Sequence, residues 1–113
     1  MGKEHLGELE ELILLMIIML GDDAYGLAIR NALKEKAGRR VTIGAVQGTV
    51  NRLESKGFIT STVGGATEER GGRSKRIFSI TNSGRQMLER SRDVKVNLWQ
   101  QIPSLALSRS DEA

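Results

Sequence analysis

The stretch IGAVQGTVNRLESKGFITSTV, residues 43–63, changes its residue pattern half way along, and this change decides the fold. As far as Lys56, apolar residues recur at the spacing of a helix face: Val46, Val50 and Leu53. Gly57 is typical of a helix end, because glycine readily adopts the left-handed conformation that follows a helix. Residues 58–63 are rich in the β-branched and aromatic residues that favour strands. The stretch therefore predicts a helix over 43–56, capped by Thr42, followed directly by a β-strand.

A second strand is expected over residues 77–80, where Ile77, Phe78 and Ile80 stand close together. The glycine pairs 64–65 and 71–72 lie between the two strand segments, so we predict a two-stranded hairpin with a long tip. Four cations fall in seven positions of this tip, and Phe78 should anchor it in the core: Arg70, Arg73, Lys75 and Arg76.

The side of helix 43–56 that lies opposite Val46 has an unusual composition. At 100° per residue it carries small and polar residues: Gly44, Gly48, Asn51 and Ser55, flanked by Gln47 and Arg52. Each glycine costs a helix about 1 kcal/mol relative to alanine, so the pair requires a reason. Either the glycines let a groove wall or backbone come near, or they allow close packing against another helix.

Two helices are predicted before this stretch. The first, over residues 6–20, is apolar on all sides, and a chain this small can hardly cover every side of it. We therefore expect a second subunit to cover part of it. Asp22 or Asp23 is the expected N-cap of the next helix, which Gly38 closes.

A last helix is expected over residues 82–102, capped by Thr81 or Asn82 and ended by Pro103. We predict one domain over residues 1–103, with a loose tail at 104–113. Helices 6–20 and 82–102 should form a dimer interface, with four candidate contact residues: Leu12, Met16, Leu98 and Trp99. In a two-fold dimer two copies of Trp99 could enclose a flat aromatic ligand, although a simple hydrophobic anchor is the plainer explanation of Trp99.

Charge is unevenly distributed along the 113 residues, whose net charge is +3. Residues 39–92 hold 11 basic and 4 acidic side chains, a net of +7. Such clustering indicates either a polyanion partner or a solvated basic surface. The chain has no cysteine, and its longest apolar run, Leu12–Leu20, falls short of the roughly 20 residues of a membrane span. We expect a cytoplasmic protein with no membrane partner.

The sequence gives little reason to expect an enzyme, a metal or a cofactor. His5 is the one histidine, and no carboxylates stand at ligand spacing around it. The adjacent acids Glu10-Glu11, Asp22-Asp23 and Glu68-Glu69 fit helix capping and solvated surface. The glycines of 64–72 lack the Gly-Lys dipeptide of a phosphate-binding loop.

Three helices followed by a basic hairpin are typical of a winged helix-turn-helix, in a fold that is mainly α with a small β-hairpin. In that fold the third helix enters the major groove of double-stranded DNA. Gln47, Asn51 and Arg52 should then touch bases or nearby phosphates, and Thr42, Gly44 and Ser55 should lie near the DNA backbone. From the hairpin, three cations should neutralise phosphates and Arg70 could enter a minor groove: Arg73, Lys75 and Arg76.

Four segments in this order resemble the PadR family of bacterial transcriptional regulators, in its short form. They are LGELEELILLMIIMLGDDAYGLAIRNAL (6–33), VTIGAVQGTVNRLESKGFI (41–59), ERGGRSKRIFSIT (69–81) and GRQML (84–88). The resemblance implies a homodimer built by the terminal helices, a palindromic operator and, usually, repression that a small aromatic molecule can release. It also implies that Gly44–Arg52 is the recognition helix and Arg70–Arg76 the wing.

The sequence departs from the family at two positions. Gln47 stands where the family commonly has tyrosine, and Ile77 where it often has a second aromatic. The missing tyrosine removes a usual phosphate or base contact, which bears on the operator and leaves the fold intact. Two rival hypotheses are a winged-helix module that holds protein partners, and a small-molecule sensor that has lost DNA binding.

Overall fold

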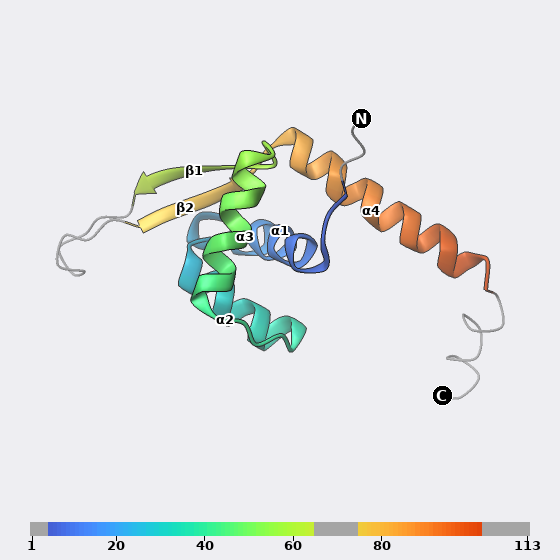
Figure 1. Cartoon of the computed structure of the whole chain (residues 1–113), viewed down its shortest axis with the longest axis horizontal. Helices are drawn as coiled ribbons and strands as arrows, with labels where there is room; N and C mark the ends of the chain where they lie inside the picture. The colour runs from blue at the N-terminus through green and yellow to red at the C-terminus, as the bar shows by residue number, and fades with distance from the viewer. Residues whose placement is uncertain (1–4, 65–74, 103–113) are drawn as a thin grey trace.

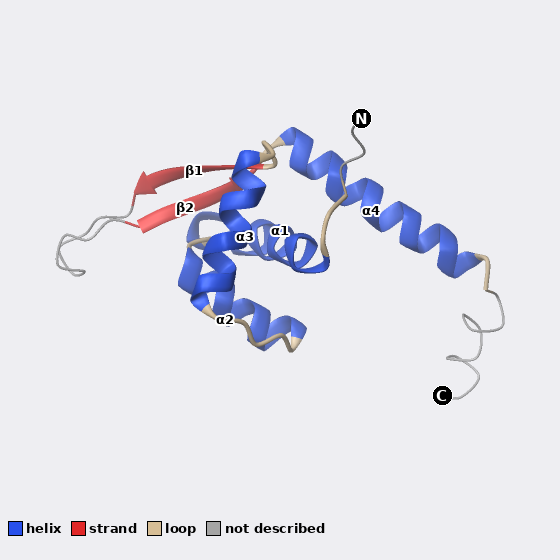
Figure 2. Cartoon of the chain, viewed as in Figure 1, coloured by secondary structure: helices blue, strands red, loops and turns tan. Residues whose placement is uncertain are grey.

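The computed structural model of the protein describes residues 5–64 and 75–102. Figure 1 shows three helices gathered into a core, a hairpin projecting from one side and a long last helix running past the other. The elements follow the order α1 (Glu8–Leu20), η1 (Gly21–Asp23), α2 (Gly26–Ala37), α3 (Ile43–Ser55), β1 (Ile59–Gly64), β2 (Lys75–Ile80) and α4 (Asn82–Gln100). The mainly helical fold with a small hairpin is as predicted (Figure 2).

The core lies where the inner faces of α1, α2 and α3 meet. The expected stripe of α3 is fully buried: Val46, Val50 and Leu53. The hairpin completes this core, since Phe58, Ile59 and Phe78 are also buried. Gly57 has a φ of 80°, which confirms its predicted place at the end of α3. Its left-handed conformation turns the chain directly from α3 into β1.

The two strands pair antiparallel, from Ile59 opposite Ile80 to Gly64 opposite Lys75. β2 therefore begins earlier than predicted, and Lys75 and Arg76 belong to a strand instead of the tip. The pairing with Val63 and Gly64 extends the ladder through both cations. The predicted tip cations Arg70 and Arg73 lie outside the described residues, as do the glycines at 65, 71 and 72.

The prediction that Asp22 or Asp23 caps α2 is wrong. Both aspartates lie in the short 3-10 helix η1, and α2 starts at Gly26 with Tyr25 as its N-cap. The reason is tertiary. The Phe78 N–H donates to the Ala24 carbonyl at 2.9 Å, and Tyr25 forms a bridge with Ile77. Residues 24–25 are thus held against β2, with Tyr25 extended, so the helix begins only after them.

The first turn of α4 is fixed tightly to the core. Thr81 caps the helix as predicted, because its Oγ1 accepts from the Gly84 N–H at 3.0 Å and donates to the Gly57 carbonyl at 2.7 Å. A Cβ added at Gly84 would lie 2.2 Å from the Phe58 carbonyl oxygen, so only glycine permits this approach. Further along, residues 92–102 are all exposed. Pro103 and the predicted loose tail 104–113 lie outside the described residues, and the extent of the domain stays a prediction.

Candidate nucleic-acid interface

The exposed face of α3 starts at a well-formed N-terminus. Thr42 is extended, with φ −80° and ψ 160°, and its Oγ1 accepts from the Ala45 N–H at 3.0 Å. Thr42, Ile43 and Gly44 are all exposed. The other backbone N–H groups of a first helical turn have no partner within the helix, and they favour an anion such as a phosphate.

The two glycines of this face have no close neighbour from another helix of the described chain. A Cβ added at Gly44 would have Thr42 Oγ1 as its nearest neighbour, at 3.8 Å. At Gly48 the nearest atom would be Nη1 of Arg52, also at 3.8 Å. Both neighbours belong to α3 or its cap, so within residues 5–64 and 75–102 no second helix packs against these glycines. Packing against another helix therefore does not explain the two glycines. The other explanation, close approach by an external ligand, still fits them.

The polar residues of the face are exposed: Gln47, Asn51 and Ser55. The Gln47 amide leans toward the start of α2, where its Nε2 would lie 3.2 Å from a Cβ added at Gly26. The Asn51 side chain makes no hydrogen bond to any described residue, so both its donor and its acceptor groups are available. The two amides, predicted to lean the same way, thus have different surroundings.

Arg52 is tied to the protein on one side. Its Nη2 donates to the Oγ1 of Thr49 at 3.1 Å, and Thr49 in turn donates to the Ala45 carbonyl at 2.8 Å. Its Nε lies 3.8 Å from the Glu10 carboxylate of α1. The side chain is nevertheless 60% exposed. The guanidinium is therefore oriented along α3 with donors left over, which suits contact with a base or a phosphate.

Glu10 is the buried acid beneath the end of α3. The Gly7 N–H donates to its Oε1 at 2.7 Å, and the Lys56 ammonium donates to its Oε2 at 3.0 Å. Burial opposes ionisation of Glu10, but the Gly7 hydrogen bond and the charges of Lys56 and Arg52 outweigh it. The pKa of Glu10 is consequently lowered from its ordinary value, and the carboxylate links α1 to α3 as an anion.

The cations of β2 already have partners within the protein. Lys75 Nζ lies 3.5 Å from the centroid of the Tyr25 ring, a cation–π contact at the side of the hairpin. Arg76 forms an ion pair with Glu54 of α3 and donates from Nε to Ser61 Oγ at 3.2 Å. Both were predicted as phosphate contacts. The charge of Arg76 lies beside α3, whereas Lys75 lies over Tyr25 before α2, and contacts between elements set the directions of both side chains.

The other predicted surface is on α1 and α4. Leu98 and Trp99 are 55% and 53% exposed on the distal part of α4, as an interface would need. Met16, in contrast, is buried in the core of its own chain, and Leu12 is half-buried. The exposed apolar side of α1 consists of other residues: Leu15, Ile18 and Met19.

A sequence model of the transcriptional regulator PadR-like family matches residues 14–90, about two thirds of the chain. The chain belongs to this family. The resemblance inferred from the sequence is therefore confirmed. Among curated proteins none matches the chain.

Solved structures of PadR-like regulators share the fold. A PadR-like regulator from Bacillus cereus has a TM-score of 0.67 at 20% identity, with 88% of this chain and 91% of that chain covered. A PadR family regulator from Clostridium difficile has a TM-score of 0.61 at 27% identity, with 88% of this chain and 94% of that chain covered. Bacillus subtilis PadR, solved in complex with operator DNA, gives a TM-score of 0.58 at 23% identity. That match covers 72% of this chain and 45% of the Bacillus subtilis chain.

Several residues that shape the site of this PadR-like protein were not predicted from its sequence: Glu10, Thr49, Glu54 and Tyr25. Glu10 stands three residues after Gly7 at a helix start, a spacing that suggests a local cap. Its second role, with Lys56, joins residues 46 positions apart, and no local pattern signals it. Position 47, where the family commonly has tyrosine, is occupied here by an exposed amide.

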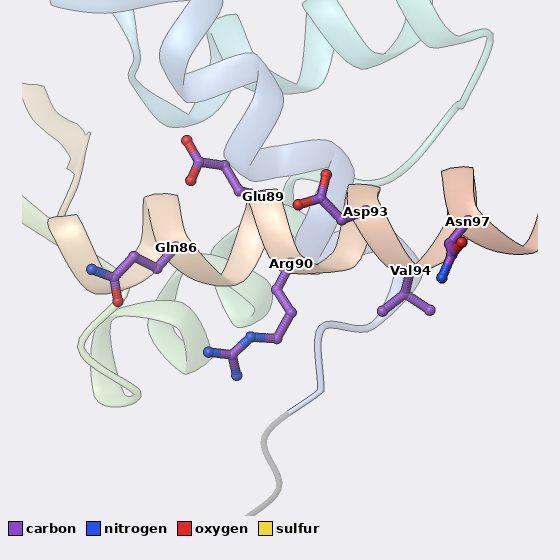
Figure 3. Close-up of a pocket in the computed structure, with 6 residues that line it drawn as sticks. All are labelled: Gln86, Glu89, Arg90, Asp93, Val94 and Asn97. Atoms are coloured by element: carbon purple, nitrogen blue, oxygen red, sulfur yellow. The ribbon is translucent and has the colours of Figure 1, made fainter.

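One shallow hollow follows the surface of α4 (Figure 3). Its six lining residues all come from this one helix: Gln86, Glu89, Arg90, Asp93, Val94 and Asn97. Arg90 and Val94 point to one side and Glu89 and Asp93 to the other. Because α4 alone lines the hollow among the described residues, its polar groups do not converge on a bound molecule as those of a built ligand site do.

Two other kinds of site find no support among the described residues. Nowhere in residues 5–64 and 75–102 do three metal-ligating side chains gather closely enough to hold an ion. No helix in that part of the chain combines the length and the apolarity that crossing a membrane requires.

Proposed function

We propose that this PadR-like protein binds double-stranded DNA with sequence specificity, through the exposed face of α3 and the basic hairpin beside it. The observation that carries the proposal is that, among the described residues, only atoms of α3 and its cap lie near Gly44 and Gly48, next to the exposed side chain of Asn51. A helix that tolerates two glycines without internal packing around them is suited to close approach by a groove wall. The operator complex of the Bacillus subtilis neighbour supports the same assignment.

Each side chain of α3 has a role that suits its chemistry. Asn51 and Gln47 offer amides that match the N6 and N7 edge of adenine, and Arg52 suits guanine or a phosphate. Thr42, Gly44 and Ser55 approach the DNA backbone, and Gly48 leaves room for it. The hairpin cations supply phosphate contacts: Arg70, Arg73, Lys75 and Arg76.

We further propose that the protein acts as a homodimer on a palindromic operator. The support is the unburied apolar surface of α1 and α4, which includes Leu15, Met19, Leu98 and Trp99. Several large apolar side chains exposed on two helices of so small a chain favour cover by another surface. A two-fold dimer presents two α3 helices, which matches a palindrome in DNA.

As the family resemblance implies, the protein would repress the genes beside its operator. A small, flat hydrophobic molecule would release the protein from the DNA. Trp99 supports the second part, because its indole is half-exposed on the proposed interface. Titration of planar aromatic dyes while the Trp99 emission is recorded tests it. Quenching at micromolar dye is expected, and unchanged emission would end the effector proposal.

Fluorescence anisotropy tests the DNA proposal. The protein is titrated onto labelled DNA from upstream of its own gene and onto a scrambled duplex, at two salt concentrations. We expect tighter binding to the upstream site, with affinity that falls steeply as salt rises. Equal weak binding to both duplexes would remove the specificity claim. No binding at low salt would favour the alternative function, a winged-helix module for an acidic protein partner.

A further inference from the structure

Three polar side chains from three different elements meet between α3 and the hairpin. Glu54 stands in the last turn of α3, Ser61 on β1 and Arg76 on β2. Ser61 Oγ donates to Glu54 Oε2 at 2.9 Å, and Arg76 Nε donates to Ser61 Oγ at 3.2 Å. Arg76 Nη2 closes the ring by pairing with Glu54 Oε1. Each of the three contacts the other two, and we call them the hinge triad.

The hinge triad continues the core outward along the hairpin. Arg76 stands two residues before Phe78, so both project from the same face of β2. The Arg76 guanidinium lies 5.1 Å from the Phe78 ring centroid. Phe78 is buried, whereas Val63, opposite Arg76, is 72% exposed. The triad therefore lies where the apolar packing of the hairpin ends. Among the described residues, it is the polar contact between the hairpin and α3 that lies farthest out along the hairpin.

The triad contributes more to the orientation of the hairpin relative to α3 than to the stability of the fold. Its charged side chains are partly exposed, Glu54 at 34% and Arg76 at 41%. A single ion pair at such a site stabilises a protein little. A carboxylate that uses both oxygens on two strands, however, fixes how those strands lie relative to the helix that carries it.

We propose that Glu54 is a positioning residue for DNA binding, which holds the hairpin at the angle to α3 that brings its cations to phosphates. The inference rests on the proposed function. It has an unusual consequence, because Glu54 is an anion next to a surface that meets a polyanion. If Glu54 only repelled phosphates, its removal would tighten binding. If it positions the hairpin, its removal weakens binding, so the sign of the effect separates the two roles.

The experiment compares Glu54→Gln and Ser61→Ala with the parent protein by DNA anisotropy over a series of salt concentrations. Glu54→Gln should weaken operator binding about tenfold, the loss of a charged hydrogen bond. Ser61→Ala should weaken it about threefold while changing no charge. The salt slope should fall in both, since a hairpin that is held less firmly brings fewer of its cations to phosphates. Matched controls are Glu35→Gln and Ser79→Ala, which remove the same groups from exposed positions outside the triad.

Amide hydrogen exchange on the free protein gives a second readout that needs no DNA. Exchange in residues 61–64 and 75–78 should accelerate in both triad variants, while α2 stays unchanged. Tighter DNA binding by Glu54→Gln, or unchanged binding and exchange in both variants, would overturn the proposal. If the parent protein bound no duplex, the proposed function would fail and the DNA role of Glu54 with it. Faster hairpin exchange would then still show that the triad holds the hairpin.

Discussion

The outer face of α3 and the distal part of α4 are both exposed helix surfaces, yet their side chains differ in size and polarity. The α3 face is small and polar, with Gly44, Gly48 and Asn51. The α4 surface is large and apolar: Val94, Leu98, Trp99 and Ile102. The α3 face exposes small residues and hydrogen-bonding groups. The α4 surface exposes apolar area, which is costly to leave in contact with water.

This difference indicates that the two surfaces meet different partners. The α3 face offers nothing for hydrophobic burial and suits a hydrated, polar groove. The distal part of α4, in contrast, exposes apolar side chains and makes few tertiary contacts. Such a helix segment is marginally stable in water. In the proposed dimer, a second copy of the chain covers it. If the two surfaces have different partners, substitutions on each should change different properties of the protein.

Leu98→Asp should break the proposed dimer, because it places a carboxylate in an apolar interface. With only one α3 bound at a time, operator affinity should fall by about 100-fold or more. Analytical ultracentrifugation measures the association and anisotropy the DNA binding. Asn97→Asp adds the same charge at the neighbouring position as a control. A Leu98→Asp protein that still sediments as a dimer would contradict the assignment of α4.

Asn51→Ala should remove base recognition from the α3 face. We expect about 2 kcal/mol less discrimination at one base pair, with the salt slope unchanged. Anisotropy against a set of single-base operator variants measures this, and Ser55→Ala serves as the control on the same face. Uniform weakening on every duplex would instead make Asn51 a backbone contact.

Glu10→Gln should destabilise the junction under α3 by about 1.5 kcal/mol at pH 7, since Lys56 loses its buried partner. The pKa of Glu10 is lowered by folding, so its contribution is full above its ordinary value of 4.5. That contribution is lost as pH falls through the lower folded value. Urea unfolding at neutral and acidic pH should show the difference between parent and variant shrinking in acid. A difference that is constant with pH would exclude an ionised Glu10 as the cause.

Gly48→Ala should act oppositely on stability and on binding. Because its Cβ would lie at an ordinary contact distance of 3.8 Å from Nη1 of Arg52, without a clash, alanine should stabilise α3 by about 1 kcal/mol. The added methyl group should at the same time weaken DNA binding, if a groove wall comes close at this point. Urea unfolding and anisotropy on one preparation measure both effects. Unchanged DNA affinity would show that the glycine serves no close contact.

Much of the fold could be predicted because its signals are local. Val46, Val50 and Leu53 repeat at helical spacing, and Gly57 marks the turn into β1. Thr42 and Thr81 cap the two helices that follow them, as predicted. The exposed face of α3 followed from the same spacing, since the side opposite a buried stripe must face outward.

The predictions that failed or changed depend on contacts between distant segments. Asp22 and Asp23 are good caps by type, but pairing of residues 24–25 with β2 moves the start of α2. Met16 looks like the other apolar residues of α1, and only the placement of α2 and α3 decides which side of α1 is covered. Arg76 looked like a tip cation until its strand placed it beside Glu54.

The order of the elements, the buried stripe of α3 and the concentration of positive charge around the hairpin could all be predicted, because each depends on residues that are neighbours in the sequence. Which charges have partners depends on the packing of the chain, since Glu10 and Lys56 lie 46 positions apart and Glu54 and Arg76 lie 22 apart. Such pairs meet through the packing of helices and strands between them. Composition gives the number of cations, and the fold determines the direction in which each one points.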